Sequence, residues 1–337
     1  METNEKDYYS LPGVSNSSLK LINPEQGGSP RKFRAFAIDR TESVETPSLR
    51  NGKLIHLYAE NPEMFKVSDV TKPSEMLSSW VEDVYNECPD ITEDEVSIDN
   101  DDLKAIAIKN RNGRYKNLKD EALVWTTFIT GFDYLIYLIS KSTHIVMDKA
   151  TFETVNGATN SLKNNDTIRP LLFSGDDPLY WAQRSYNELP VQWDIVVNID
   201  GTDQVLNCKA LIDRLTVDTI SKVVKLIDLK TTSKSLSLFK NAFEDYHYYR
   251  QLAFYKIAVR QFLDIQFPDI KFEIECYIIA VETIGQYESA VFRVSDEYLI
   301  KGDNEVNELL SLVGYHYLTD NWINTKEELL NNGIRKL

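Results

Sequence analysis

The chain has 337 residues, a formal net charge of −15 at pH 7 and a hydrophobic composition of 42%. This length and composition suffice for a large folded core and argue against global disorder. The negative charge argues against a broad basic face for nucleic acid, but does not exclude DNA as a substrate. No apolar run approaches the roughly 20 residues of a spanning helix, and the N-terminus lacks a signal-peptide layout, so we expect no membrane association.

The three cysteines are Cys88, Cys208 and Cys276. Their wide spacing predicts neither a disulfide framework nor a zinc or iron–sulfur site. A reducing, cytoplasmic setting fits this usage best.

In chain order, we expect one domain with four parts. Residues 1–65 form an N-terminal helical segment, in which Ser15 or Asn16 caps a short helix and SPRKFRAF makes a small basic and aromatic patch. Residues 66–150 form an acidic and helical insertion. Residues 151–283 form the core that carries the chemistry, and residues 284–337 add a C-terminal strand and helix.

The insertion begins with an acidic stretch, residues 75–102, that contains no Lys or Arg. A solvated surface is the simpler interpretation, and mimicry of DNA or binding of a partner is the alternative. The stretch is followed by the basic tract IKNRNGRYKNLK, residues 108–119, and then by an apolar helix at residues 131–140.

The core has a readable order of elements. Residues 151–165 are helical, and strands rich in β-branched residues are expected at 190–200, 205–213 and 221–232. Asp200-Gly201 makes a turn between the first two strands. One long helix at 236–263 and a fourth strand at 270–283 follow. The pattern α-β-β-β-α-β predicts an α/β fold with a mixed sheet flanked by helices.

Asp228-Leu229-Lys230 ends the third strand after the apolar run VVKLI. Residues two apart on a strand share a face, so the carboxylate and the ammonium lie side by side. Charges at the end of a central strand are costly unless they are paired or bind metal. Carboxylates there would hold Mg²⁺ or Mn²⁺, and a lysine could stabilise charge developing on a phosphate.

The D-x-K pattern alone is weak, because it also occurs at Asp102–Lys104 and Asp269–Lys271. Only Asp228–Lys230 ends a strand that looks buried and follows a second aspartate at the end of a strand, Asp213. A short connection between the two strands would bring the two aspartates together. A surface salt bridge at a sheet edge is the alternative interpretation.

Four further residues are candidates for the site. Gln251 and Tyr255 lie four apart and therefore share one helix face, where they could support the site or the DNA; in isolation such a pair is more often packing. His56, on the predicted helix GKLIHLYAENPEMF, and Glu188, just before the first strand, could be additional metal ligands. A hydrogen-bonded histidine and an ordinary surface glutamate are the alternatives.

Taken together, this ordered set resembles the RecB-like branch of the PD-(D/E)XK nuclease superfamily, and most closely its phage and prophage RecE-type exonucleases. VSNSSLKLI and SPRKFRAF resemble the opening segment of that family, and GKLIHLYAENPEMF resembles its histidine motif. CKALIDRL, which contains Lys209, and LIDLKTT resemble its core motifs, and RQLAFY resembles its Gln–Tyr helix. Leu211 stands where relatives often carry Arg, and Asp228 where many carry Glu.

The resemblance implies degradation of linear double-stranded DNA from 5′ to 3′, which leaves 3′ single strands for an annealing recombinase. It also implies a homo-oligomer encoded by a phage or prophage and active in the host cytoplasm. Asp213 and Asp228 would bind Mg²⁺ or Mn²⁺ with His56 and Glu188 nearby, Lys230 would be the catalytic lysine, and Gln251, Tyr255 and Lys209 would support the site or contact DNA.

Three alternatives remain open. An endonuclease could use the same core, and so could an iron–sulfur nuclease, although three scattered cysteines do not supply the four ligands of a cluster. The third alternative is a non-catalytic module that binds DNA ends or a partner. The retained Asp–Asp–Lys set argues against that module.

Overall fold

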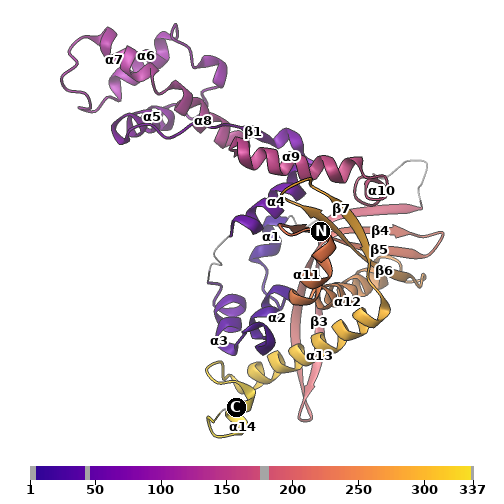
Figure 1. Ribbon diagram of the computed structural model, residues 1–337. Helices are drawn as coiled ribbons and strands as arrows, with labels where there is room; N and C mark the ends of the chain where they lie inside the picture. The colour runs from indigo at the N-terminus through magenta and orange to yellow at the C-terminus, as the bar shows by residue number, and fades with distance from the viewer. Residues whose placement is uncertain (1–4, 42–45, 175–181, 335–337) are drawn as a thin grey trace. The chain divides into compact units, whose positions relative to one another are not determined.

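The computed structural model describes residues 5–41, 46–174 and 182–334 (Figure 1). The chain divides into two compact units. One unit comprises Met1–Gly52 and Asn160–Leu337, and the other comprises Lys53–Thr159. The predicted insertion, residues 66–150, falls inside the second unit.

A five-stranded mixed sheet forms the centre of the first unit, with strand order β3-β4-β5-β6-β7. β3 to β5 are antiparallel neighbours, β5 and β6 are parallel, and β6 and β7 are antiparallel. With α9 (Lys149–Asn164) before the sheet and α12 between β5 and β6, the predicted α-β-β-β-α-β order and α/β class are confirmed. The strands are β3 (Gln183–Ile199), β4 (Thr202–Asp218), β5 (Val223–Thr232), β6 (Glu273–Glu282) and β7 (Ser289–Arg293).

The turn between β3 and β4 is the one expected from Asp200-Gly201. Both residues have positive φ, 51° and 86°, which is the conformation of the two-residue turns that match strand twist. Both strands are longer than predicted, because β3 begins at Gln183 and β4 runs on to Asp218. Glu188 therefore lies within β3 rather than before it, and Asp213 lies within β4 rather than at its end.

The segment after β5 is not the single long helix that the sequence predicts. It forms η5 (Leu236–Leu238), α11 (Phe239–Asp245) and α12 (Tyr248–Gln266). His247 separates the two α-helices in a left-handed conformation with φ 53°, which a right-handed helix cannot contain. The His247 ring lies 2.9 Å from Glu305 and 3.0 Å from the Tyr249 hydroxyl.

Helices α12 and α13 (Asp296–Thr319) pack together over the sheet (Figure 1). A Cβ at Gly302 would overlap the backbone carbonyl of Tyr249, so glycine allows the two helices to approach closely. The C-terminal α14 (Lys326–Leu330) follows α13, and the short α10 (Arg169–Leu172) follows α9.

The N-terminal segment contains α1 (Glu5–Ser10), α2 (Asn16–Ile22), η1 (Pro24–Gln26), α3 (Pro30–Phe33) and a π-helical turn, η2 (Arg34–Ile38). Ser15 caps α2 through a capping box with Ser18, as one of the two predicted capping residues. Val14 pairs with Cys208 of β4 in a parallel bridge, which attaches this segment to the sheet.

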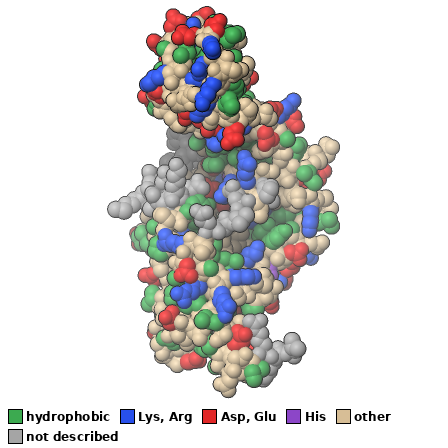
Figure 2. Space-filling model, turned by 90° about the vertical axis from the view of Figure 1, so that its left-hand side faces the viewer, with side chains coloured by type: hydrophobic (Ala, Val, Ile, Leu, Met, Phe, Trp, Pro, Cys, Tyr) green, Lys and Arg blue, Asp and Glu red, His purple; other side chains and the backbone are tan. Residues whose placement is uncertain are grey.

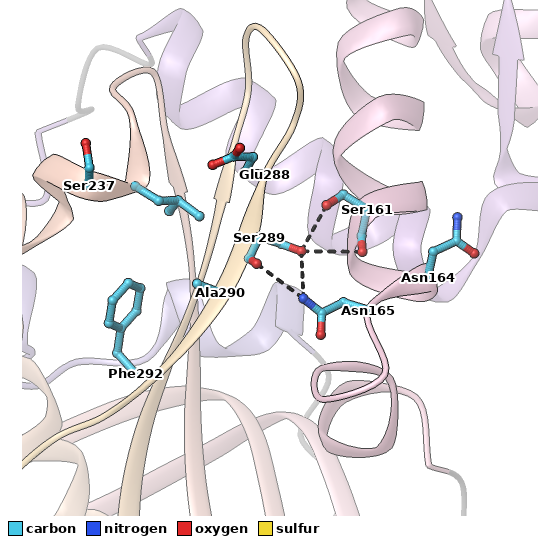
Figure 3. Close-up of a pocket in the computed structure, with 9 residues that line it drawn as sticks. Ser161, Asn164, Asn165, Ser237, Glu288, Ser289, Ala290 and Phe292 are labelled. Atoms are coloured by element: carbon cyan, nitrogen blue, oxygen red, sulfur yellow. Dashed lines mark hydrogen bonds between the residues drawn. The ribbon is translucent and has the colours of Figure 1, made fainter.

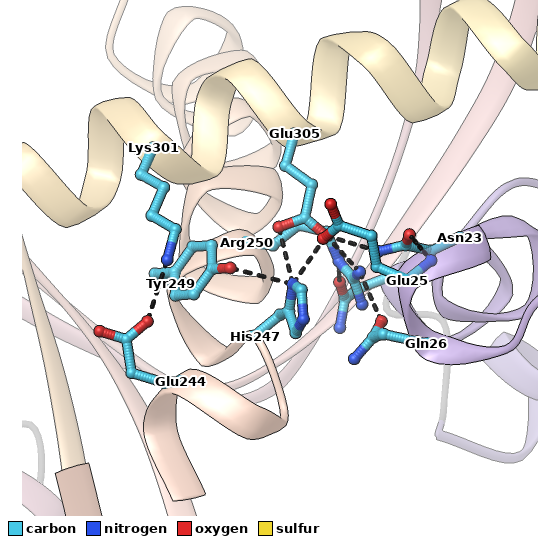
Figure 4. A network of polar contacts seen from close by, with 10 residues as sticks. Asn23, Glu25, Gln26, Glu244, His247, Tyr249, Arg250, Lys301 and Glu305 are labelled. Atoms are coloured by element: carbon cyan, nitrogen blue, oxygen red, sulfur yellow. Dashed lines mark hydrogen bonds and ion pairs between the residues drawn. The ribbon is translucent and has the colours of Figure 1, made fainter. Parts of the chain in front are cut away.

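A buried polar network joins the N-terminal segment to α12 and α13 (Figure 4). Arg250 is 1% exposed and donates to Asn16, Gln26 and Glu305. Glu305 also accepts from the Asn23 amide at 2.8 Å. A buried guanidinium is tolerated only when it is paired and hydrogen-bonded, so these contacts fix α2 and η1 against α12.

The second unit is mainly helical and has a hydrophobic core of its own, built around Trp80, Phe128 and Leu135. A short parallel pair, β1 and β2, accompanies the helices. The elements are α4 (Pro47–Glu60), which begins in the first unit, η3 (Pro62–Met64), β1 (Phe65–Val67), α5 (Glu75–Glu87), η4 (Glu93–Glu95), α6 (Asp101–Lys109), α7 (Glu121–Ile129), α8 (Phe132–Thr143), β2 (Ile145–Met147) and the start of α9.

Ion pairs neutralise part of the acidic stretch from within this unit. Lys109 lies 2.5 Å from Glu87, and Arg114 lies 2.7 Å from Asp83. The basic tract thus folds back onto α5. Within the described part of the chain, no single helix has the length and apolar character to cross a membrane; α7 and α8 meet these criteria only as a pair bent by 52°.

Candidate active site

The candidate site lies where β4 and β5 separate. These strands pair from Arg214↔Ile227 to Asp218↔Val223, and the next position in register would be Asp213 opposite Asp228. There the ladder stops, and Asp213 Oδ2 accepts instead from the Leu229 amide at 2.8 Å. The expectation that the two aspartates meet through a short connection is therefore confirmed.

Asp228 is almost completely buried, with 1% of its surface exposed. Its Oδ1 accepts from the Gln251 amide at 3.0 Å, and its Oδ2 lies 2.7 Å from Lys230 Nζ. A carboxylate at this depth is costly without such partners. The ion pair of Asp228 and Lys230 is therefore present, but it is not a surface salt bridge, because Asp228 is buried.

Lys230 points to the same face as Asp228, as strand alternation predicts, and its side chain is 19% exposed. Burial favours the neutral amine, but the negative charges of Asp228 and Asp213 outweigh burial and raise the pKa of Lys230. The ammonium also lies 5.2 Å from the centre of the Tyr248 ring. Lys230 is therefore a fixed cation beside the two carboxylates.

Gln251 and Tyr255 share a helix face, and the structure brings both to the site. The Gln251 amide donates to Asp228 and also to the Tyr255 hydroxyl at 2.9 Å. Burial, and then the charges of Asp228 and Asp213, raise the pKa of Tyr255 well above its ordinary value, so it remains a phenol. Sequence reasoning missed Tyr248, although its place three residues before Gln251 puts it on the same helix face.

Glu188 and Asp213 face each other across β3 and β4. The pairs on either side, Asn187↔Arg214 and Leu189↔Ile212, put these two residues opposite in register. Their carboxylate oxygens lie within 4.8 Å of each other, and Glu188 has a left-handed φ of 44°. A left-handed glutamate inside a strand is strained, and such strain concentrates at functional sites.

This donor set fits a divalent cation. Two carboxylates so close repel each other unless a proton or a cation lies between them. Carboxylate oxygens are the ligands that Mg²⁺ and Mn²⁺ prefer. Glu188 and Asp213 are the side chains whose oxygens converge for such an ion, and Asp228 is the next carboxylate, opposite Asp213 in register.

Lys209 and His56 are the two remaining predicted site residues. Lys209 Nζ donates to the backbone carbonyls of Tyr8 and Leu11, so it holds the N-terminal segment against β4. His56 lies on α4, in the second unit. The roles of Lys209 at DNA and of His56 at the metal therefore stay predictions.

A shallow pocket of about 630 Å³ lies along the edge strand β7 (Figure 3). Ser289 of β7 is hydrogen-bonded to Ser161 and Asn165, which fixes the end of α9 there. The pocket contains none of the predicted site residues. Its lining is Ser161, Asn164, Asn165, Leu236, Ser237, Glu288, Ser289, Ala290 and Phe292.

Residues 196–319 match the family described as a PDDEXK-like domain of unknown function, DUF3799. The matched segment contains Asp213, Asp228, Lys230 and Gln251. The match supports a core of the PD-(D/E)XK superfamily in this part of the chain. It supports the expected nuclease fold and the divalent-metal chemistry typical of that superfamily.

No curated protein shows significant similarity to the chain. Among solved structures, one that matches is a provisionally named exonuclease from Eubacterium rectale. It is 13% identical with a TM-score of 0.49, and the match covers 99% of this chain and 89% of that one. A likeness at this level carries no argument about activity.

Proposed function

We propose that the protein is a metal-dependent exodeoxyribonuclease that degrades linear double-stranded DNA. The observation that carries the proposal is the fork between β4 and β5, where Asp213, Asp228 and Lys230 come together in the first unit. A structural salt bridge would need one carboxylate for one ammonium. Here one ammonium lies beside two carboxylates, and a third, from Glu188, faces that of Asp213.

Each side chain has a role in this proposal. Glu188, Asp213 and Asp228 bind a Mg²⁺ or Mn²⁺ ion, with His56 as a further candidate ligand. When bound, the ion would polarise the scissile phosphate and lower the pKa of a water molecule. Lys230 stabilises charge that develops on the phosphate. Gln251 holds Asp228 in orientation through its amide, and Tyr255 holds Gln251.

The finer parts of the proposal rest on the sequence resemblance. They are attack from 5′ to 3′, release of 3′ single strands for an annealing recombinase, a homo-oligomeric assembly and a role in phage recombination. The alternatives are an endonuclease on the same core and a non-catalytic module that binds DNA ends.

End-labelled linear duplexes, blocked at either the 5′ or the 3′ end, test the proposal against a closed circle. The protein should shorten linear DNA with Mg²⁺ or Mn²⁺, stop with EDTA and spare the circle. Asp228→Asn should abolish cleavage and weaken Mn²⁺ binding in calorimetry. The matched control is Asp102→Asn, which changes the aspartate of the D-x-K match on helix α6. This variant should cleave DNA like the wild-type protein.

Cleavage of the circle would favour an endonuclease. If the folded wild-type protein neither cuts linear DNA nor binds Mn²⁺, the non-catalytic module is correct and the proposal fails.

A further inference from the structure

Residues 20–40 are basic in a chain whose net charge is −15. We call residues 20–40 the N-terminal basic segment. It holds five cations and two acids, Glu25 and Asp39, and all five cations are exposed. Figure 2 shows Lys and Arg side chains gathered on a face of the first unit. The five cations are Lys20, Arg31, Lys32, Arg34 and Arg40.

Neutral groups, rather than carboxylates, hold most of these cations. Arg31 donates to the Ile323 carbonyl, Lys32 to the Gly27 carbonyl and Arg40 to the Ser10 carbonyl. Among the described residues, the one ion pair in this segment joins Arg34 to Asp39 at 3.5 Å. A carbonyl orients the side chain without cancelling its charge, and an arginine keeps further N–H donors for another partner.

The basic tract of the second unit behaves differently. There Lys109 pairs with Glu87 and Arg114 pairs with Asp83, so part of that tract is neutralised within its own unit. The sequence contains two basic stretches of similar appearance. Among the described residues, the N-terminal stretch has one ion pair for its five cations, and the tract of the second unit has two for its five.

Contacts of Gln26, and of Val14 and Asn16 just before the N-terminal basic segment, attach this part of the chain to the elements that carry the site. Val14, just before α2, pairs with β4 at Cys208, and Arg250, next to Gln251 on α12, donates to Asn16 and Gln26. At the far end of the segment, Arg40 lies close to Lys209. Burial lowers the pKa of the Lys209 ammonium, and the positive charge of Arg40 lowers it further.

Spacing along β4 gives the scale of the separation. Lys209 precedes Asp213 by four residues on one strand, which is about 13 Å at about 3.3 Å per residue. Successive phosphates of one DNA strand are about 3.4 Å apart along the helix axis. The separation of Lys209 from Asp213 along β4 therefore corresponds to about four base pairs.

From these observations we infer that the N-terminal basic segment binds the phosphate backbone of the duplex whose scissile phosphate lies at Asp213 and Asp228. The inference rests on the proposed function and adds the surface that holds the substrate. Backbone contacts of this kind carry affinity without sequence preference. They give a protein with a negative net charge a local site for DNA.

The salt dependence of DNA binding tests the inference. A fluorescent 30-base-pair blunt duplex is titrated with full-length protein in EDTA, so that binding is measured without cleavage. The test variant is Lys20→Gln, Arg31→Gln, Lys32→Gln. The control variant is Lys116→Gln, Lys119→Gln, Lys141→Gln, which removes the same charge from exposed lysines of the second unit.

Each lost phosphate contact should reduce the slope of log Kd against log salt by about 0.9. We expect the test variant to lose about 2 to 3 from this slope, and the control variant to keep the wild-type value. The charge-retaining variant Lys20→Arg, Arg31→Lys, Lys32→Arg should restore it. Restoration rules out a folding defect, which thermal melting checks separately.

An equal loss of slope in the test and control variants would mean that DNA binding depends on net charge alone, and would overturn the inference. An unchanged slope in the test variant would overturn it as well. If the wild-type protein still cuts linear DNA in either case, the proposed function stands. A wild-type protein that neither binds nor cuts DNA refutes the proposed function itself.

Discussion

Replacement of Lys230 by Met should destabilise the protein, because it removes the cation beside a buried carboxylate. Asp228 is 1% exposed, and Lys230 lies 2.7 Å from its Oδ2. Loss of one partner of a buried ion pair costs about 3 to 5 kcal/mol. Since Lys230 is 19% exposed, the lower end applies, about 3 kcal/mol. For a unit of this size, that corresponds to a fall in Tm of about 6 to 12 °C.

Replacement of Lys230 and replacement of Asp228 should lower the free energy of unfolding by different amounts. Lys230→Met leaves a carboxylate that is almost completely buried, whereas Asp228→Asn leaves an ammonium that is partly exposed. We therefore expect Asp228→Asn to cost less free energy of unfolding. The double variant should cost less than the sum of the two single variants.

The direction of the pKa shift of Lys230 determines the pH at which stability should be measured. The folded pKa of Lys230 is raised above its ordinary 10.5, so the contribution of the ammonium to stability is complete below about 10.5. It is lost only as pH rises through the folded pKa. Thermal and denaturant unfolding at neutral pH, in EDTA to exclude metal, therefore report the whole effect. Equal stability of Lys230→Met and wild type, with no coupling in the double-variant cycle, would refute the reasoning.

Two further predictions concern α12 and α13. Gln251→Leu should lower kcat on linear DNA about 10- to 100-fold and change KM little, because a hydrogen bond to a charged group is worth about 1.5 to 3 kcal/mol. The control is Gln261→Leu, on the exposed face of α12. Equal kcat values in the two variants would contradict the role of Gln251 in orienting Asp228. His316 is fully buried, and burial lowers its pKa from 6.5, so stability should be lost as pH falls from about 6.5 toward the folded pKa. Denaturant midpoints across that range should slope for wild type and less for His316→Phe, and identical slopes would show that another group titrates.

Strand alternation and apolar patterning were enough to predict the centre of the site. The run VVKLI predicted a buried strand, and two-residue spacing put Asp228 and Lys230 on one face. Helical spacing likewise put Gln251 and Tyr255 on one face. These are local periodicities of the backbone, so the sequence alone determines them once the element type is correct.

Tertiary structure decided what depends on partners distant in the sequence. Strand register, rather than local pattern, extends β3 and β4 and brings Glu188 opposite Asp213 inside the sheet. His247 breaks the expected long helix while its ring lies against Glu305 of α13.

The two basic stretches show most clearly which properties the sequence determines and which the tertiary structure decides. The sequence does not show whether a given Lys or Arg will face a carboxylate or a carbonyl. Only the fold sets Glu87 and Asp83 against one stretch and the carbonyls of Gly27 and Ser10 against the other. Composition therefore predicted where the charge is, and the tertiary structure decided which of that charge is available to a partner.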